Sequence, residues 1–266
     1  MTKSTPTLAV ALIVKNEAKH LQACLETVAG WVDEIVILDS GSTDTTEHIA
    51  RSFTDKFFVN TDWQGFGPQR RLAQSYIESD YVLWLDADER VTPELKASIL
   101  QAVQEDTENT LYAVNRLSSA FGKFINHSGW SPDWLVRLYR TKNTRYNEAL
   151  VHEKVIEGSY QIKKISGHLQ HFTYESLHQY ISKTTGYLKA WADEREGKKK
   201  SNLSIAILHA IASFTKMYII KLGFLDGKHG FILAWLCMNS TFIKYVDLYL
   251  REQDKNSENI INHHNL

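Results

Sequence analysis

The chain of 266 residues lacks the features that mark several classes of protein. It has only two cysteines, Cys24 and Cys237, far apart in sequence, so we expect no disulfide framework and a reducing, cytoplasmic environment. The net charge of −1 provides no general attraction for nucleic acid, and we expect no nucleic-acid partner. The first apolar run, residues 8–14, is too short for the core of an ordinary signal peptide. Internal repeats and low-complexity tracts are also missing.

Long uncharged apolar runs are missing as well. Residues 203–250 are rich in aliphatic and aromatic side chains, but lysines and Asp226 interrupt them. The uncharged runs therefore fall short of the roughly 18–20 residues that span a bilayer. Two interpretations stay open and are compatible with each other. The region is a helical hairpin packed on the rest of the chain, or an apolar surface with lysines at its edges that docks on an anionic membrane.

The first half of the chain alternates strand and helix patterns. Apolar runs predict strands over residues 8–14, 34–38, 56–60 and 81–86. Helices are predicted over residues 18–29, 44–53 and 69–78 and from Pro93 onward, and Asp44 with Glu47 resembles a capping box at the second of them. Short buried strands that alternate with helices indicate an α/β fold with a mostly parallel central sheet and right-handed crossovers.

The pattern changes after about residue 111. Residues 111–116 and 134–140 resemble strands, with a loop-rich connection that contains Gly122, Gly129 and Pro132. A helix is predicted from Ser176 to residue 192, and the charged residues 193–200 are expected to form a solvated linker.

Carboxylates follow several of the predicted strands. Asp86 and Asp88 end the apolar run 81–86, while Glu17 follows the first strand and Asp39 the second. Burying unpaired carboxylates is costly, but a divalent cation at a strand end compensates their charge. Because ligands of open α/β sheets bind at the carboxyl ends of the strands, these groups are expected to converge in one cleft. The arrangement suggests a metal-assisted reaction on a phosphorylated substrate.

In order and spacing, four segments resemble the inverting glycosyltransferases of family 2, which have the GT-A fold: residues 10–17, 37–44, 65–70 and 84–89. The resemblance is closest to the bacterial lipopolysaccharide core enzymes of the β-1,4-glucosyltransferase type, which modify the inner-core heptose. Further matching segments are residues 129–133, 136–139, 151–153, 171–174 and 223–227, so the resemblance covers residues 8–249. One departure is Arg71, where many relatives have asparagine.

The resemblance implies a role for each acidic residue. Glu17, Asp39, Arg70 and Asp86 would bind the nucleotide-sugar, with the first two on the base and ribose. Asp88 would ligate the metal directly, with Asp86 on the ribose or on metal-bound water. Mg²⁺ and Mn²⁺ both suit such hard oxygen ligands. His171 would be a further ligand that favours Mn²⁺, and His168 competes with it for this role.

Inversion requires one base that removes the proton of the acceptor hydroxyl. Glu153, in the segment Val-His-Glu, is the first candidate and Asp133 the second. Either carboxylate could instead be the salt-bridge partner of Arg137 or Arg140. Trp130 and Trp134 are candidates for a wall on which a sugar stacks, or for ordinary core packing.

The predicted function is the metal-dependent transfer of a hexose, glucose from UDP-glucose, to a hydroxyl of the lipid A–core oligosaccharide. The alternatives are a polyprenyl-phosphate glycosyltransferase and a non-catalytic, membrane-associated sugar-binding protein. A haloacid-dehalogenase-like phosphatase is disfavoured, because Arg90 stands where a small β-branched residue is expected.

The expected GT-A domain covers residues 1–175, with a nucleotide-sugar half over 1–115 and an acceptor half over 116–175. The expected helical region over 176–266 would bind the cytoplasmic face of the inner membrane peripherally. Lysines would contribute to this binding: Lys198, Lys199, Lys200, Lys216, Lys221 and Lys244.

Overall fold

The computed structural model describes residues 5–150 and 153–264, and for residues 254–264 only the backbone. The chain forms two compact units. The first comprises Met1–Leu117 and Asp133–Phe172, and the second comprises Ser118–Pro132 and Thr173–Leu266. The segment Ser118–Pro132 thus groups with the C-terminal helices, whereas the sequence suggested one boundary near residue 175. The assignment of functional domains remains a proposal.

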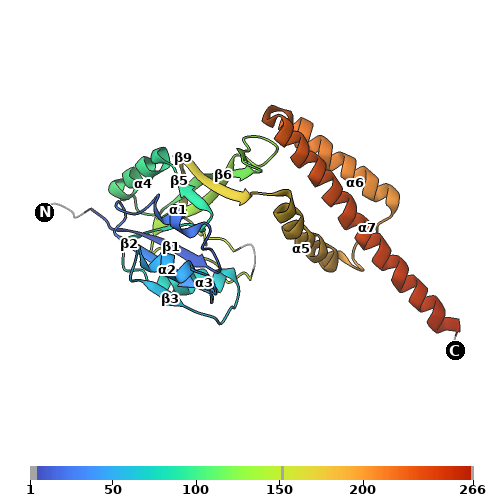
Figure 1. The fold of residues 1–266 in the computed structure, drawn as a ribbon, viewed down its shortest axis with the longest axis horizontal. Helices are drawn as coiled ribbons and strands as arrows, with labels where there is room; N and C mark the ends of the chain where they lie inside the picture. Colours follow the sequence, from blue (N-terminus) through green and yellow to red (C-terminus); the bar gives the residue numbers. More distant parts are fainter. Residues whose placement is uncertain (1–4, 151–152, 265–266) are drawn as a thin grey trace. The chain divides into compact units, whose positions relative to one another are not determined.

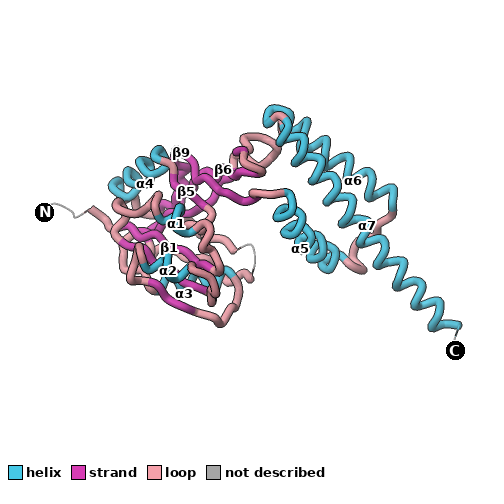
Figure 2. The backbone as a smooth tube through the Cα atoms, viewed as in Figure 1, coloured by secondary structure: helices cyan, strands magenta, loops and turns pink. Residues whose placement is uncertain are grey.

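The first unit is built around a mixed sheet (Figure 2). Its parallel half has the order β3–β2–β1–β4, formed by β1 (Leu8–Val14), β2 (Glu34–Asp39), β3 (Phe57–Val59) and β4 (Tyr81–Trp84). The sheet continues with β8 (Asp133–Arg140), β6 (Thr110–Ala120), β9 (Gln161–Tyr174) and β5 (Glu89–Val91). Strand β8 runs antiparallel to both β4 and β6, and β5 runs antiparallel to β9. The prediction of an α/β fold is confirmed, and the predicted parallel arrangement is found in the half of the sheet that strands β1 to β4 form.

Helices cover both faces of the parallel strands, because alternate side chains of each strand point to opposite faces. Leu8, Val10 and Leu12 of β1 join a core with the buried faces of α1 (Leu21–Leu25), α2 (Thr46–Arg51) and α4 (Pro93–Glu105). Ala11 joins a second core, to which α3 (Phe66–Ser75) contributes Ala73. The buried strands are apolar on both faces for this reason.

Two local predictions about helices need correction. Helix α1 is shorter than the predicted range 18–29, since residues 26–31 form turns. Asp44 does not open α2 as a capping box: the residue before the helix is Thr45, which makes no side-chain cap. Asp44 instead accepts hydrogen bonds from the backbone N–H of Thr46 and, at 3.2 Å, of Ala18. At α4 the expected start is confirmed, with the Thr92 hydroxyl accepting from the N–H of Leu95.

The second unit consists largely of helices (Figure 1). It contains α5 (Leu177–Arg195), α6 (Leu203–Thr215) and α7 (Lys228–His264), with a π-helical turn, η1 (Lys216–Ile220), and a 3₁₀ helix, η2 (Gly223–Asp226), between α6 and α7. Strand β7 (Lys123–Phe124) pairs with the end of β6. A small core joins the segment 118–132 to the helices through Ala120, Ile125, Met217, Leu233 and Ala234.

Two stretches of this unit are long and apolar enough to cross a membrane by length and composition, Leu203–Ile220 and Lys228–Gln253. Only 17% of the first stretch, and 28% of the most apolar 18 residues of the second, are buried. Both stretches contain lysines, so their uncharged runs still fall short of a span, as the sequence indicates, while the helices continue through the lysines that interrupt those runs. The charged stretch 193–200 is also partly helical, since α5 ends at Arg195.

Candidate active site

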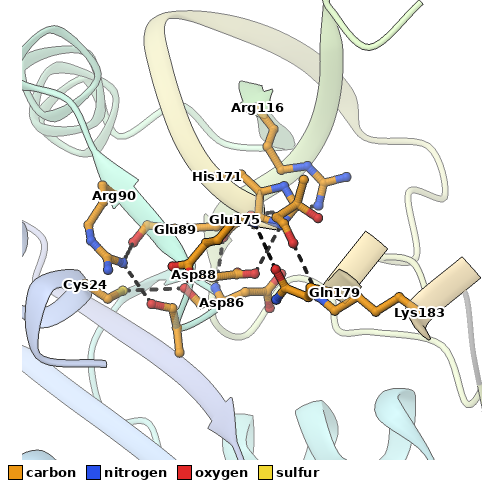
Figure 3. A network of polar contacts seen from close by, with 12 residues as sticks. Cys24, Asp86, Asp88, Glu89, Arg90, Arg116, His171, Glu175, Gln179 and Lys183 are labelled. Atoms are coloured by element: carbon orange, nitrogen blue, oxygen red, sulfur yellow. Dashed lines mark hydrogen bonds and ion pairs between the residues drawn. The ribbon is translucent and has the colours of Figure 1, made fainter. Parts of the chain in front are cut away.

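The acidic segment lies on a tight turn between β4 and β5. The backbone N–H of Glu89 donates to the carbonyl of Asp86 at 2.9 Å, and the N–H of Asp86 donates to Oε2 of Glu89 at 2.9 Å. The Glu89 side chain is fully buried. These reciprocal bonds close the turn and fix the position from which Asp86 and Asp88 project (Figure 3).

Two arginines bind Asp86, one at each oxygen. Nη2 of Arg70 lies 2.6 Å from Oδ1, and Nη2 of Arg137 lies 2.8 Å from Oδ2. Burial by itself would raise the pKa of Asp86, but the two guanidinium groups outweigh it and hold that pKa well below its usual range. Asp86 is therefore a carboxylate each of whose oxygens accepts from one arginine.

Arg137 also reaches Glu89, with Nη2 3.2 Å from Oε1. Burial raises the pKa of the Glu89 carboxyl, and Arg137 opposes that effect only in part. Arg137 itself is almost fully buried, as expected for a cation that lies between two acids. It is thus the central counter-ion of the turn.

Asp88 and His171 face each other, with Nε2 of His171 3.3 Å from Oδ2 of Asp88 (Figure 3). Their proximity follows from strand register: Glu89 of β5 pairs with His171 of β9, and the N–H of Phe172 donates to the carbonyl of Asp88. His168 lies three residues earlier in β9, an odd offset that turns its side chain to the other face. Its backbone carbonyl accepts from the Thr92 hydroxyl instead.

The donor atoms of Asp88 and His171 fit a divalent cation. Ligand atoms at about 2.1 Å in adjacent octahedral positions lie about 3 Å apart, close to the separation of these two atoms. Among the side chains of residues 5–150 and 153–253, no group of three His, Cys, Asp or Glu could hold a metal. Such a centre would therefore need oxygens from a bound diphosphate, the usual mode for Mg²⁺.

Glu153 lies beside Asp86 in a pocket of about 490 Å³. Its carboxylate is 15% exposed, and Oε1 accepts from Nε of Arg70 at 3.1 Å. Among the residues that the structure describes, Arg70 is its only hydrogen-bonding partner, so Oε2 is available to a ligand. Val151 and His152, the other residues of the Val-His-Glu segment, lie outside the described residues.

Arg70 therefore holds two acids from the two sides of the site. Its guanidinium lies over the rings of Trp84 and Tyr146, at 5.2 and 4.9 Å from their centroids. Its Nη1 is buried and has no hydrogen-bond partner within the described chain. The aromatic rings and the two acids leave Arg70 little freedom to move.

Asp133, the second candidate base, pairs with Arg116 at 2.8 Å. The sequence had suggested Arg137 or Arg140 as partners of Glu153 or Asp133, and both suggestions are wrong. Arg137 binds the acidic turn, and Arg140 binds Asp106. Trp134 lines the same pocket as Glu153, whereas Trp130 packs against the small core of the second unit.

A second pocket, of about 420 Å³, lies at the carboxyl end of β1. Its walls include Glu17, Ser40 and two exposed aromatic residues, Trp63 and Phe66, which meet edge to face at 4.9 Å. Asp39 is buried beside this pocket and accepts from the backbone N–H groups of its own turn, at 3.1 Å from Gly41 and 2.8 Å from Ser42. Asp39 thereby shapes the loop that follows β2.

Helix α3 contacts both pockets through adjacent residues. Nε2 of Gln69 donates to the Ser40 hydroxyl at 3.0 Å, while Arg70 reaches Asp86 and Glu153. The start of α3 lies against the segment 147–150 so closely that a Cβ on Gly67 would be 2.2 Å from the carbonyl oxygen of Asn147. This contact explains the glycine and brings the chain that leads to Glu153 against the helix.

Sequence reasoning missed Arg116, Arg137 and Tyr146 as parts of the site. A usable signal was present for Arg137, because an arginine inside the apolar strand 134–140 requires a buried acid. The aromatic pair at the second pocket also went unnoticed, although Trp63 and Phe66 flank the Gly65 that begins α3.

The family model described as "Glycosyl transferase family 2" matches residues 9–193. An uncharacterized glycosyltransferase of Rickettsia typhi is 28% identical over 262 residues, covering 94% of this chain and 88% of that protein. A lipopolysaccharide core biosynthesis glycosyltransferase, LpsC of Rhizobium meliloti, is 26% identical over 264 residues, covering 95% and 96%.

Among solved structures, S. aureus TarS 1-349 in complex with UDP has a TM-score of 0.48 at 16% identity, covering 94% of this chain and 92% of that one. Glucosyl-3-phosphoglycerate synthase of Mycobacterium tuberculosis with Mn²⁺ and UDP-glucose has a TM-score of 0.35 at 23% identity, covering 44% and 45%. The fold assignment rests on the strand order and the family match.

Proposed function

This chain belongs to glycosyl transferase family 2, and we propose that it is a metal-dependent, inverting enzyme that transfers glucose from UDP-glucose to a hydroxyl of the lipopolysaccharide inner core. The similarity to LpsC supports the acceptor class, because it extends over 95% of this chain. Its working place would be the cytoplasmic face of the inner membrane, where a lipid A–core acceptor is accessible.

The observation that carries the proposal is the position of Arg70, which joins Asp86 of the acidic turn to Glu153 in one pocket. A transferase needs its proton acceptor close to the donor's reactive carbon, and this arginine would maintain that relation. Two opposed carboxylates that are held by one buried cation are difficult to explain as packing alone, since burial of charges is costly.

We assign the donor to the pocket beside β1. Glu17 would accept hydrogen bonds from the uracil N–H or the ribose hydroxyls, and Trp63 with Phe66 would cover the base. Asp88 and His171 would hold Mg²⁺ or Mn²⁺, which when bound neutralises charge on the departing diphosphate. Asp86, oriented by Arg70 and Arg137, would accept from a ribose hydroxyl or from water near the diphosphate.

Glu153 would act on the acceptor. Its Oε2 would accept the proton of the acceptor hydroxyl while the hydroxyl oxygen bonds to the anomeric carbon, and the bond from that carbon to the phosphate oxygen of UDP would break on the opposite face. One displacement of this kind inverts the anomeric configuration. Asp133 is a weaker candidate, because the guanidinium of Arg116 binds it through both Nε and Nη2.

The experiment that tests the proposal uses the full chain with a panel of UDP-sugars, Mg²⁺ or Mn²⁺, and an isolated lipid A–core acceptor that lacks outer sugars. We expect UDP release and a β-linked product with UDP-glucose, determined by NMR of the new anomeric proton. Transfer to a polyprenyl phosphate without transfer to the core would show that the acceptor is the polyprenyl phosphate and not the lipopolysaccharide core. UDP-sugar binding without any transfer would support the sugar-binding alternative.

A further inference from the structure

The turn between α6 and α7 displays a dense group of exposed apolar side chains. We call residues 216–235 the hairpin tip; it contains η1, η2 and the start of α7. Eight large apolar residues here are at least 41% exposed: Ile219, Ile220, Leu222, Phe224, Leu225, Phe231, Ile232 and Trp235. A concentration of exposed apolar side chains of this kind indicates a site of interaction with a protein or a membrane.

The charge around the hairpin tip has one sign. Between Glu196 and Asp247 the sequence contains seven lysines, no arginine and one acid, Asp226. Lys216, Lys221 and Lys228 are exposed, whereas Asp226 is only 2% exposed. Within residues 197–246 the exposed Asp, Glu, Lys and Arg side chains are therefore all lysines, which favours an anionic partner.

Asp226 is buried because its carboxylate binds the segment 118–132 of the same unit. Oδ1 accepts from the backbone N–H of Asn126 at 3.1 Å, and Oδ2 accepts from that of His127 at 3.1 Å and from the Ser128 hydroxyl at 2.8 Å. Nζ of Lys123 donates to its carbonyl at 2.8 Å. The one acid of the region thus fixes the tip from within and offers no surface charge.

The hairpin tip is tightly packed inside. A Cβ on Gly230 would lie 1.8 Å from the carbonyl oxygen of Gly223, so only glycine permits this approach of α7 to η2. Phe231 makes ring contacts with Phe214 and Tyr218 at 5.9 and 5.8 Å between centroids. Because the interior is filled, the outer apolar side chains have no room to turn inward.

We propose that the hairpin tip inserts into the interfacial region of an anionic lipid bilayer. Its apolar side chains would lie among the upper acyl chains, and Lys216, Lys221 and Lys228 at the level of the phosphates. Two copies of the chain would bring like charges together, which disfavours self-association. A full span would carry these lysines across the hydrocarbon core, which is costly.

The proposed membrane contact involves a shorter segment, residues 216–235, than the region 198–244 that the sequence suggested. Lys199 lies against the rings of Trp191 and Tyr245, at 5.8 and 4.7 Å, and Lys244 lies 5.0 Å from the ring of Trp191. These two lysines are occupied within the unit, whereas those of the tip are exposed. The biological role of this membrane contact rests on the proposed function, because an acceptor that is linked to lipid requires the enzyme to work at such a surface.

The first test is co-sedimentation of the full chain with vesicles of phosphatidylcholine containing phosphatidylglycerol, compared with phosphatidylcholine alone. We expect binding to the anionic vesicles that weakens at high salt. Lys221→Glu with Lys228→Glu should reduce it by about tenfold or more. The matched control, Lys198→Glu with Lys200→Glu, reverses two exposed lysines away from the tip and should bind nearly as well as the parent. Equal loss in both pairs would overturn the proposal.

The second test separates the tip from the sides of the hairpin. Ile220→Gln with Leu225→Gln should weaken vesicle binding by about tenfold, because both side chains would enter the acyl region. Leu208→Gln with Ile211→Gln alters equally exposed residues of α6 and should have little effect. Equal loss in these pairs, or a parent protein that resists extraction by alkaline carbonate, would show a hairpin that lies flat or spans, and would refute tip insertion.

The two proposals fail separately. Vesicle binding requires neither donor nor acceptor, so a chain that binds vesicles but transfers no sugar contradicts the proposed function alone. A chain that glycosylates a delipidated core oligosaccharide but does not bind anionic vesicles contradicts only the proposal that the hairpin tip inserts into a bilayer. UDP binding by each variant shows that the first unit is folded.

Discussion

Nε of Arg70 lies 3.1 Å from Oε1 of Glu153, so the candidate base is tied to a cation that also holds the acidic turn. The distance has a chemical consequence. A proton that arrives on Glu153 removes its attraction for Arg70, and the same arginine then interacts more strongly with Asp86. Under the proposed function, proton transfer at the acceptor and charge at the donor side would therefore be linked through one side chain.

Replacing Glu153 by glutamine should separate binding from chemistry. The amide keeps the shape of the side chain but cannot take a proton, so we expect transfer to fall by about 10²- to 10⁴-fold with UDP binding unchanged. Steady-state kinetics and calorimetric titration with UDP measure the two effects. Asp133→Asn is the comparison, and a larger loss there than in Glu153→Gln would move the base to Asp133.

Removing Asp88 should abolish the metal dependence of nucleotide binding. Without that carboxylate, His171 alone holds the cation, so Mn²⁺ should no longer tighten the binding of UDP to Asp88→Ala. Titration of the variant and the parent with UDP, with and without EDTA, measures this effect of the metal on UDP affinity directly. The exposed Asp55→Ala serves as control, and parent protein whose transfer is unaffected by EDTA would rule out the metal-dependent mechanism.

Arg137→Met should destabilise the first unit strongly. The change leaves the fully buried Glu89 beside Asp86 with only the more distant guanidinium of Arg116, at 3.9 Å, and breaking such a buried pair costs about 3–5 kcal/mol. Urea denaturation of the variant measures this change in the free energy of unfolding. Adding Glu89→Gln to Arg137→Met should recover part of the loss, and a double variant as unstable as the sum of the single changes would contradict the pairing.

Glu34 should make stability depend on pH. Burial alone would raise its pKa, but the Lys56 ammonium and the hydroxyl and N–H of Ser79 lower it below the ordinary value. A lowered pKa in the folded chain means that the stabilisation is complete above the unfolded value, about 4.3, and is lost as pH falls through the folded value. The Tm difference between parent and Glu34→Gln should therefore be large at pH 7 and shrink toward pH 3.

The exposed Glu108→Gln provides the control for that series. Its Tm should follow the parent at every pH, because Glu108 is exposed and only its backbone carbonyl is engaged. A constant difference between parent and Glu34→Gln across the whole pH range would mean that the carboxylate contributes through packing only.

Gly67→Ala should impair transfer more than UDP binding. Its new methyl group would meet the carbonyl of Asn147 and push the segment 147–150 away from α3, which displaces Glu153 from Arg70. The measurement is kcat for transfer beside the Kd for UDP. Gly186→Ala in α5 has open space around its Cβ and should leave both unchanged. Normal transfer by Gly67→Ala would show that this segment adapts freely.

The parallel half of the fold was predictable because its strands are apolar over their whole length. Runs such as Leu8–Val14 have no alternative to burial, and Thr92 with Pro93 marks the start of α4. Strands β5 and β9 carried no such signal. Strand β5 is the tripeptide Glu-Arg-Val, and the first half of β9 is mostly exposed, so neither shows an apolar pattern.

The site was predictable for residues with a local signature and not for their partners. Asp86 and Asp88 were found from the strand that precedes them, and Glu17 from its place after β1. Arg116 and Arg137 were not, since Arg137 lies 51 residues from Asp86 and no local pattern pairs them. Side chains that act through distant partners require the register of the sheet, which the sequence pattern does not contain.

The register between β5 and β9 also limits how this protein can vary during evolution. One residue inserted just before His171 would turn the imidazole to the opposite side of the sheet, and two would shift it by nearly 7 Å along the strand. The first change would place the imidazole and Asp88 on opposite sides of the sheet, and the shift in the second exceeds the 3.3 Å that separates His171 from Asp88. Acceptor preference can therefore diversify through loops of new length elsewhere in the long stretch between these residues, while the strand pair itself must keep its length.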